Sequence, residues 1–322
     1  MNKVLKKWLI IAITLIVVGL ISFCMVMYMF NWNFKKLSTL KYENNIYEIN
    51  ESFNSITIDA DATDIVLAMS DDETIKVECY EPKKAKHSVT VENNTLIIKE
   101  NQDNAWYDNI GISFDTPKIT VYLLKTDYET LAINNSTGDI EIPKDFKFIN
   151  ADILLSTGHV NFYSTVIDLL KIKASTGSIC VKNVTVGSLD LKLTTGTTTL
   201  TEINCENDVS INASTGKTYL SNVRCKNLTS GADTGDINLS EVNVTEKLYI
   251  TGSTGDVDLE RSDASEIFIE TDTGDVEGSL LTDKIFIVNT DTGDIDVPKT
   301  TTGGKCEITT DTGDIEISIV NE

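Results

Sequence analysis

Apolar residues recur at fixed distances from a Thr-Gly pair that returns ten times at a regular interval after residue 130. In most copies they stand two and four positions after the glycine, and five and seven positions before it. Apolar positions two apart, with polar residues between them, have the period of a β-strand, and the β-branched residues that strands favour dominate these positions. Each copy therefore predicts a strand, a tight turn at Thr-Gly, a second strand and a short connection.

The copies follow one another at intervals of 19 or 20 residues. The glycines that mark them are Gly138, Gly158, Gly177, Gly196, Gly216, Gly235, Gly255, Gly274, Gly293 and Gly313. A unit this small cannot bury its own apolar side, whereas stacked units share a continuous core. We therefore expect an all-β protein in which residues 131–322 form a β-solenoid of about ten rungs, coiled like a right-handed β-helix. A flat stack of two-stranded meanders is the alternative, but it would leave one face of each strand pair less uniformly apolar.

The turn has a chemistry of its own. Glycine adopts positive φ without steric cost, and the residue two positions before it is Ser, Thr or Asp in all ten copies. Such side chains accept backbone N–H groups in tight turns. Residues 61–65 resemble a degenerate copy of this turn, with Thr63 in the place of the glycine.

The N-terminal part of the chain has a different composition. Residues 8–30 carry no charge and are long enough to cross a bilayer as a helix. Because Lys3, Lys6 and Lys7 precede this segment, we expect residues 1–7 to be cytoplasmic and the C-terminal domain to be extracellular, in a single-pass protein of the cell membrane. A cleaved signal peptide is the alternative, but no small-residue cleavage site is visible. We expect residues 31–50 to be a juxtamembrane stalk and residues 51–130 to be an irregular β cap.

The chain is strongly acidic, with a formal net charge of −22. Residues 1–41 hold six Lys and no acid, so the remainder holds 21 basic and 49 acidic groups, a net charge of −28. A body of this charge argues against nucleic acid as a partner and is typical of a soluble ectodomain.

Aspartates recur on both sides of the turn. They follow the glycine directly at Asp236, Asp256, Asp275, Asp294 and Asp314, and they precede it by two positions at Asp272, Asp291 and Asp311. If the rungs stack in register, these carboxylates form two rows spaced by roughly 4.8 Å. Two interpretations remain open. The aspartates are turn-forming residues that face water, or the rows bind a divalent cation such as Ca²⁺, which prefers carboxylate oxygens.

Cysteine and histidine give no strong signal. Cys205 and Cys225 each lie nine residues after a glycine, so they should occupy adjacent rungs, either as buried thiols or as a disulfide. The six cysteines have no paired short spacing and indicate no zinc site. His87 and His159 lie in no recognisable motif, and no nucleophile elbow, metalloprotease helix or phosphate loop is present. We therefore expect no enzyme and no cofactor, apart from the open question of Ca²⁺.

Two runs, residues 119–124 and 131–140, carry a resemblance to a known family. The second run contains Ser136-Thr137-Gly138-Asp139. Together they resemble the bacterial putative-adhesin β-strand-repeat family, domain of unknown function 4097. A Pro usually follows the first strand, and here Leu124 stands in its place. The resemblance covers about residues 50–322. It implies a β-repeat fold, often behind one N-terminal membrane helix, and no established reaction.

These observations favour a membrane-anchored, non-catalytic binding or scaffold module at the cell surface. Its expected partners are the membrane, through residues 8–30, and envelope proteins or cell-wall and surface glycans. An accessory or sensor protein of cell-envelope stress regulation is the alternative, because related domains occur beside such regulators. A polysaccharide-active β-helix enzyme is a further alternative, although only Arg224 and Arg261 supply arginine.

Overall fold

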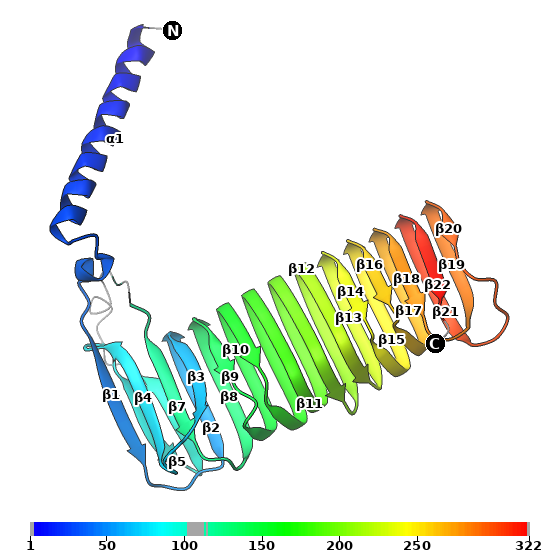
Figure 1. Cartoon of the computed structure of the whole chain (residues 1–322), viewed down its shortest axis with the longest axis horizontal. Coiled ribbons are helices and arrows are strands. Elements are labelled where there is room, and N and C mark those ends of the chain that lie inside the picture. Colours follow the sequence, from blue (N-terminus) through cyan, green and yellow to red (C-terminus); the bar gives the residue numbers. More distant parts are fainter. Residues whose placement is uncertain (1–2, 102–112, 114, 321–322) are drawn as a thin grey trace.

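A computed structural model describes residues 3–101, 113 and 115–320 of the chain. It shows one N-terminal helix that stands away from a long β body (Figure 1). The helix α1 (Lys3–Met29) is followed by a short 3₁₀ helix η1 (Phe34–Leu37). Over Val4–Met29, α1 is long and apolar enough to cross a membrane, which agrees with the segment predicted from the sequence.

All strands of the body belong to one continuous sheet that coils around a single core. The strands before the regular repeats are β1 (Tyr42–Ile49), β2 (Ser55–Ala62), β3 (Asp64–Met69), β4 (Ile75–Pro82), β5 (His87–Glu92), β6 (Thr95–Glu100) and β7 (Lys118–Leu123). The next are β8 (Asp127–Thr137), β9 (Ile140–Ile142), β10 (Lys147–Phe162), β11 (Thr165–Cys205), β12 (Asp208–Cys225), β13 (Asn227–Thr234) and β14 (Ile237–Ser240). The last are β15 (Asn243–Thr254), β16 (Val257–Glu260), β17 (Asp263–Thr273), β18 (Val276–Leu280), β19 (Lys284–Thr292), β20 (Ile295–Asp296), β21 (Gly304–Thr312) and β22 (Ile315–Ile319).

Successive rungs pair in parallel and in register, so that residues one repeat apart lie side by side. Leu189 of β11 pairs with Val209 of β12, which pairs with Leu228 of β13, and all three side chains are buried. Apolar ladders of this kind fill the inside of the coil over its whole length. The β-solenoid of about ten turns that the sequence predicts is confirmed.

The glycines of the Thr-Gly turns form a column of their own. Their φ angles lie between 131° and 156°, a region that L side chains rarely adopt. A Cβ on any of them would come within 1.7–2.4 Å of a backbone oxygen of the neighbouring rung. The glycine is therefore required twice, by its own backbone conformation and by the close approach of the next turn.

At the C-terminal end, the order of the rungs in space differs from their order in the chain. β21 pairs with β17 on one side and with β19 on the other, and β22 lies in the same way between β18 and β20. After β18, the chain leaves the position beside β17 and β18 open and forms the outermost rung with β19 and β20 (Figure 1). β21 and β22 then return and fill the open position between the two rungs. The exposed end of the stack is therefore formed by residues 284–296 and not by the last strand of the chain.

A buried ion pair spans the inserted rung. Lys284 Nζ of β19 lies 2.6 Å from Asp263 Oδ1 at the start of β17, and both side chains are nearly inaccessible. Asp263 also accepts the backbone N–H groups of Ala264 and Leu281. Between them Gly304 of β21 has no side chain to obstruct the lysine, and a Cβ there would lie 1.8 Å from the Ser265 oxygen. Because removing one partner of a buried pair leaves an uncompensated charge, loss of either side chain would destabilise this end of the stack.

The N-terminal end shows a similar exchange. β2 and β3 pair with β8 and β9 on one side and with β6 and β7 on the other, all in parallel. Thr63, between β2 and β3, occupies the glycine column: its backbone N–H donates to Thr137, and its carbonyl oxygen faces Gly138. The degenerate turn predicted at residues 61–65 therefore belongs to a regular rung, rather than to an irregular part of the cap.

The cap itself is made of antiparallel strands. β4 pairs with β7, β5 pairs with β6, and β1 pairs with β4 along its whole length. The stalk predicted for residues 31–50 is thus wrong for 42–49, because those residues complete the cap sheet. Residues 102–112 and residue 114 lie outside the described part of the chain.

The glycine column gives a direct test of the stacking. Gly196→Ala places a Cβ 1.8 Å from the oxygen of Gly177 at a φ of 140°, and we expect it to cost about 4 kcal/mol or more of unfolding free energy. The matched control is Gly231→Ala, where the nearest atom is a Thr251 side-chain oxygen at 3.4 Å. Denaturant unfolding of the detergent-solubilised protein measures both. Equal stabilities of the two variants would contradict the column.

Candidate functional site

A row of aspartates follows the glycine column, as the sequence predicts, and four of its five carboxylates accept a backbone N–H of the next rung. The backbone N–H of Asp256 donates to Asp236 Oδ1 at 3.4 Å, and that of Asp275 donates to Asp256 Oδ1 at 2.9 Å. The N–H of Asp314 donates to Asp275 at 2.8 Å, and that of Asp294 to Asp314 at 2.8 Å. The last two aspartates stand in exchanged order. One oxygen of each accepting carboxylate therefore has a structural role, as turn chemistry requires.

A second row of acids runs parallel to the first, two residues further along each rung. It contains, in spatial order, Asp258, Glu277, Glu316 and Asp296. Burial and then the nearby Asp256 and Asp236 raise the pKa of Asp258, and burial and then Asp258 raise that of Glu277. By contrast, Lys217 lies 2.8 Å from Asp236 Oδ2 at one end of the first row and lowers the pKa of Asp236. The acidic face is thus two carboxylates wide.

The third set of predicted aspartates lies on the other side of the turn. Asp272, Asp291 and Asp311 are all exposed, and the register of their rungs places Asp311 between the other two. In both this row and the first one the rungs stack in register, so the carboxylates form rows, which is the condition stated above for cation binding. Binding itself stays a prediction.

On another outward face, a shallow groove of about 530 Å³ ends at two aromatic rings. Its lining residues are Asp208, Val209, Ser210, Asn227, Thr229, Lys247, Tyr249 and Phe268. Ser210, Thr229, Tyr249 and Phe268 are register partners on four successive rungs, so the column changes from small hydroxyls to large rings. The two rings lie 6.5 Å apart, and Tyr249 is 43% exposed. We call this feature the aromatic groove.

A line of polar side chains borders the aromatic groove. Asn227 donates to Asp208 Oδ1 at 2.8 Å and accepts the backbone N–H of Lys247 at 3.2 Å. Lys247 forms an ion pair with Glu266 at 3.3 Å. At the far end, Lys305 of the inserted rung lies 5.0 Å from the centre of the Phe268 ring. The groove therefore offers ring faces beside carboxylate, amide and ammonium groups.

His159 lies exposed in the row that carries the aspartates elsewhere. Its Nδ1 is 2.6 Å from Ser178 Oγ on the next rung, whereas Asp139 accepts its backbone N–H at 2.9 Å. In a hydrolytic triad the carboxylate would orient the imidazole ring. Here the Asp139 carboxylate accepts the backbone N–H of His159 and does not orient its ring. Asp139, His159 and Ser178 therefore continue the row of turn residues that follow the glycines.

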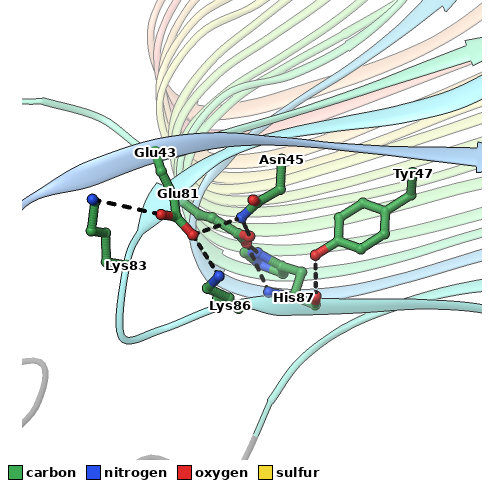
Figure 2. Close-up of polar contacts among 7 residues, drawn as sticks. All are labelled: Glu43, Asn45, Tyr47, Glu81, Lys83, Lys86 and His87. Atoms are coloured by element: carbon green, nitrogen blue, oxygen red, sulfur yellow. Dashed lines mark hydrogen bonds and ion pairs between the residues drawn. The ribbon is translucent and has the colours of Figure 1, made fainter.

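A buried polar cluster lies in the cap, between β1, β4 and the start of β5 (Figure 2). Glu81 is fully buried; its Oε2 is 2.7 Å from both the backbone nitrogen and Nδ1 of His87, and its Oε1 accepts from Asn45 at 2.6 Å. Tyr47 donates to the His87 carbonyl oxygen at 3.1 Å. Beside this cluster, Lys86 lies 2.5 Å from Glu43 and lowers the pKa of that carboxyl.

The predicted cysteine neighbours do lie on adjacent rungs. Asn204 pairs with Arg224, which places Cys205 beside Cys225, and both are buried free thiols. Burial raises the pKa of Cys205 to about 11 and that of Cys225 to about 12. As free thiols the two side chains pack in the core like small apolar groups. The alternative, a disulfide between them, stays a prediction.

Comparison with known proteins identifies the family. The model described as Toastrack DUF4097 matches residues 53–210 and 204–322. The architecture defines a β-solenoid repeat protein, and the chain belongs to the DUF4097 family. No curated protein matches the chain.

Several solved structures resemble the fold. One is described as a putative adhesin from Bacteroides fragilis, with 16% identity and a TM-score of 0.44, covering 86% of this chain and 97% of its own. Another is described as a putative lipid binding protein from Parabacteroides distasonis, with 16% identity and a TM-score of 0.46, covering 73% of this chain and 96% of its own. A putative adhesin from the same species has 15% identity and a TM-score of 0.45, covering 87% and 98%. At these similarities none of them is evidence for a ligand.

The row that contains Asp258 and Glu277, which runs beside the row of turn aspartates, predicts an unusual pH dependence of stability. The folded-state pKa values of Asp258 and Glu277 lie above their unfolded-state values. The free energy of unfolding therefore rises as the pH falls through the range between the folded-state and unfolded-state pKa values of these two groups. At neutral pH both ionised groups cost stability. Because both side chains are exposed and water screens their repulsion, we expect Asp258→Asn with Glu277→Gln to raise the melting temperature at pH 7 by only about 1–2 °C, and by less at pH 4. The exposed Glu270→Gln is the control. An equal effect at both pH values would contradict this account.

The same melts test the calcium hypothesis. Asp275→Asn with Asp314→Asn keeps an oxygen for each backbone N–H but removes two adjacent charges. If the row binds Ca²⁺, the ion raises the melting temperature of the unmodified protein and not of this variant. The absence of any calcium-dependent shift would leave the aspartates as turn-forming residues.

Proposed function

We propose that this protein is a membrane-anchored, non-catalytic binding module that holds neutral glycans of a cell surface in the aromatic groove. The groove is the observation that carries this proposal. A sugar ring presents C–H groups on its faces and hydroxyls at its edge. An aromatic side chain packs against the former, while polar neighbours bind the latter.

The neighbours of Tyr249 and Phe268 supply both kinds of contact. The hydroxyls of Ser210 and Thr229 lie on the same column, and Asp208 and Asn227 lie beside it. Because Asp208 and Asn227 already hold each other, their free atoms are oriented before a ligand arrives. Such pre-organisation lowers the cost of binding.

Charge selects among the glycans. The part of the chain after residue 41 carries a net charge of −28, which repels acidic polysaccharides at long range. Lys247 is paired with Glu266 and Lys305 with Glu307, so neither lysine is a free site for a carboxylate. These properties favour a neutral ligand.

The anchor explains the location of the module. Helix α1 carries Lys3, Lys6 and Lys7 at its start, and the acidic body follows it. Because lysines favour the cytoplasmic side of a membrane, we propose that the body lies outside the cell, in a single-pass arrangement. The stack separates helix α1 from strands β12, β13, β15 and β17, which carry the residues of the aromatic groove (Figure 1).

Binding of neutral oligosaccharides tests the proposal. Calorimetric titration of the detergent-solubilised chain with hexamers of N-acetylglucosamine and of glucose should detect weak binding of at least one of them. Tyr249→Ala and Phe268→Ala should each weaken it at least tenfold, about 1.4 kcal/mol, because the stacking surface is lost.

Tyr219→Ala is the matched control, since Tyr219 is a comparably exposed tyrosine that does not line the groove. Its affinity should equal that of the unmodified protein. Undiminished binding by Tyr249→Ala, or binding of neither hexamer, would refute the aromatic groove as a glycan site.

A further inference from the structure

The two ends of the stack differ. At the N-terminal end the rungs give way to the antiparallel strands β1, β4 and β5, which carry no Thr-Gly turn. At the C-terminal end, β19 pairs with β21 and β20 pairs with β22, and neither has a second partner strand among the described residues. One backbone edge of the outermost rung is therefore free. This free edge and helix α1 lie at opposite ends of the molecule (Figure 1).

The core of the coil is open at the free edge. Ile295 occupies the inward column two positions after its glycine, and it is 45% exposed, whereas its register partner Ile315 is fully buried. Phe286 and Val288 occupy the inward columns of β19 and are only partly buried, although their register partners on β21 are fully buried. The outermost rung therefore presents apolar side chains that every inner rung covers.

The outward positions of the same rung are apolar as well. Ile285 and Ile287 of β19 are 45% and 51% exposed, whereas their register partners on β21 are Lys305 and Glu307. Edge strands usually carry charged residues, which prevent pairing with another chain. Residues 285–290 carry no charge. A free edge that is apolar on both faces is a surface for the addition of a further strand.

We propose that this end of the stack is a self-association surface, at which β19 pairs with β19 of a second copy of the chain. An antiparallel pair with its two-fold axis at Phe286 places inward residues opposite inward residues. It also places Ile285 of each copy opposite Ile287 of the other, as an apolar cross-strand pair. Asp283 then faces Asn289, so that no two like charges stand directly opposite each other on these strands.

The size of the surface is sufficient for a weak dimer. A rung of 19 or 20 residues, at roughly 3.3 Å per residue, has a perimeter of roughly 65 Å. With its side chains, the end of such a rung covers on the order of 500 Å². Two ends together bury on the order of 1,000 Å², which is the lower limit for a specific interface.

Symmetry and charge favour a second copy as the occupant. Two-fold pairing uses the free edge of both chains, so assembly stops at the dimer. The cap cannot take this place, because its antiparallel strands do not continue the glycine column. The acidic bodies repel each other, but the paired segment itself is uncharged. The surface is separate from the aromatic groove, which lies on earlier rungs.

Sedimentation of the full chain in detergent tests the proposal. We expect a reversible equilibrium between monomer and dimer, with a dissociation constant in the micromolar range. Added NaCl should strengthen it, because salt screens the repulsion between the acidic bodies. Ile287→Lys should weaken dimerisation at least tenfold and leave the melting temperature unchanged, because this side chain is exposed in the monomer.

Leu154→Lys is the matched control, because Leu154 is a comparably exposed leucine on β10, away from the free edge. It should dimerise like the unmodified chain. A chain that stays monomeric at every concentration, or a dimer that persists in folded Ile287→Lys, would overturn the proposal. Assemblies larger than a dimer would also overturn it, since two-fold pairing leaves no edge free.

Cross-linking tests the register of the pair. The background is Cys24→Ser with Cys180→Ser, which removes the two cysteines that are not buried. A mixture of Ile285→Cys and Ile287→Cys chains should form a disulfide-linked dimer on mild oxidation, because these positions face each other across the interface. Equal cross-linking by the Ile287→Cys chain alone would contradict a two-fold axis at Phe286.

Discussion

The close approach of backbone at the glycine column is the constraint on which the rest of the structure depends. At each Thr-Gly turn, a carbonyl oxygen of one rung occupies the space that a side chain of the next would need. Rungs can therefore stack only glycine on glycine, or on the backbone of Thr63 at the first turn. Since side chains alternate along a strand, fixing one position fixes the face of every residue in the rung. The apolar ladders, the acidic rows and the aromatic column all follow from this register.

Register does not fix order, and the two ends of the stack show this. Every rung presents the same columns, so a rung can be exchanged with its neighbour without displacing a single column. At the C-terminal end the exchange places Asp314 between Asp275 and Asp294, and Lys305 against the ring of Phe268. The row of turn aspartates and the surroundings of the aromatic groove therefore both contain residues from rungs that are adjacent in space but not consecutive in the sequence. The surfaces proposed for binding are columns of side chains on an extended sheet rather than an enclosed pocket.

The fold could be predicted from the sequence, because the repeat shows directly the length of one rung, the position of its turn and the residues that face inward. The sequence was also sufficient to place Cys205 beside Cys225 and to align the aspartates that follow the glycines. It could not predict the exchanged rungs, whose columns are the same in either order. It missed β1, where polar residues alternate with few apolar ones, and it missed the cluster around Glu81, because Glu81 and His87 meet only through the path of the cap strands. Tyr249 and Phe268 occupy one column one repeat apart, a signal that was present but that we did not use.

The central claim is that the surface columns have the exchanged order, and engineered disulfides across the acidic face test it most directly. Glu277 and Glu316 are register partners, whereas Asp296 lies one rung further out, beside Glu316. Adjacent rungs are roughly 4.8 Å apart, within the Cα separation that a disulfide tolerates, and two rungs are roughly 9.6 Å apart and beyond it. In a background with Cys24 and Cys180 replaced by Ser, mild oxidation should cross-link Glu277→Cys with Glu316→Cys and not Glu277→Cys with Asp296→Cys. The opposite pattern would show that the rungs stack in sequence order and would contradict this account.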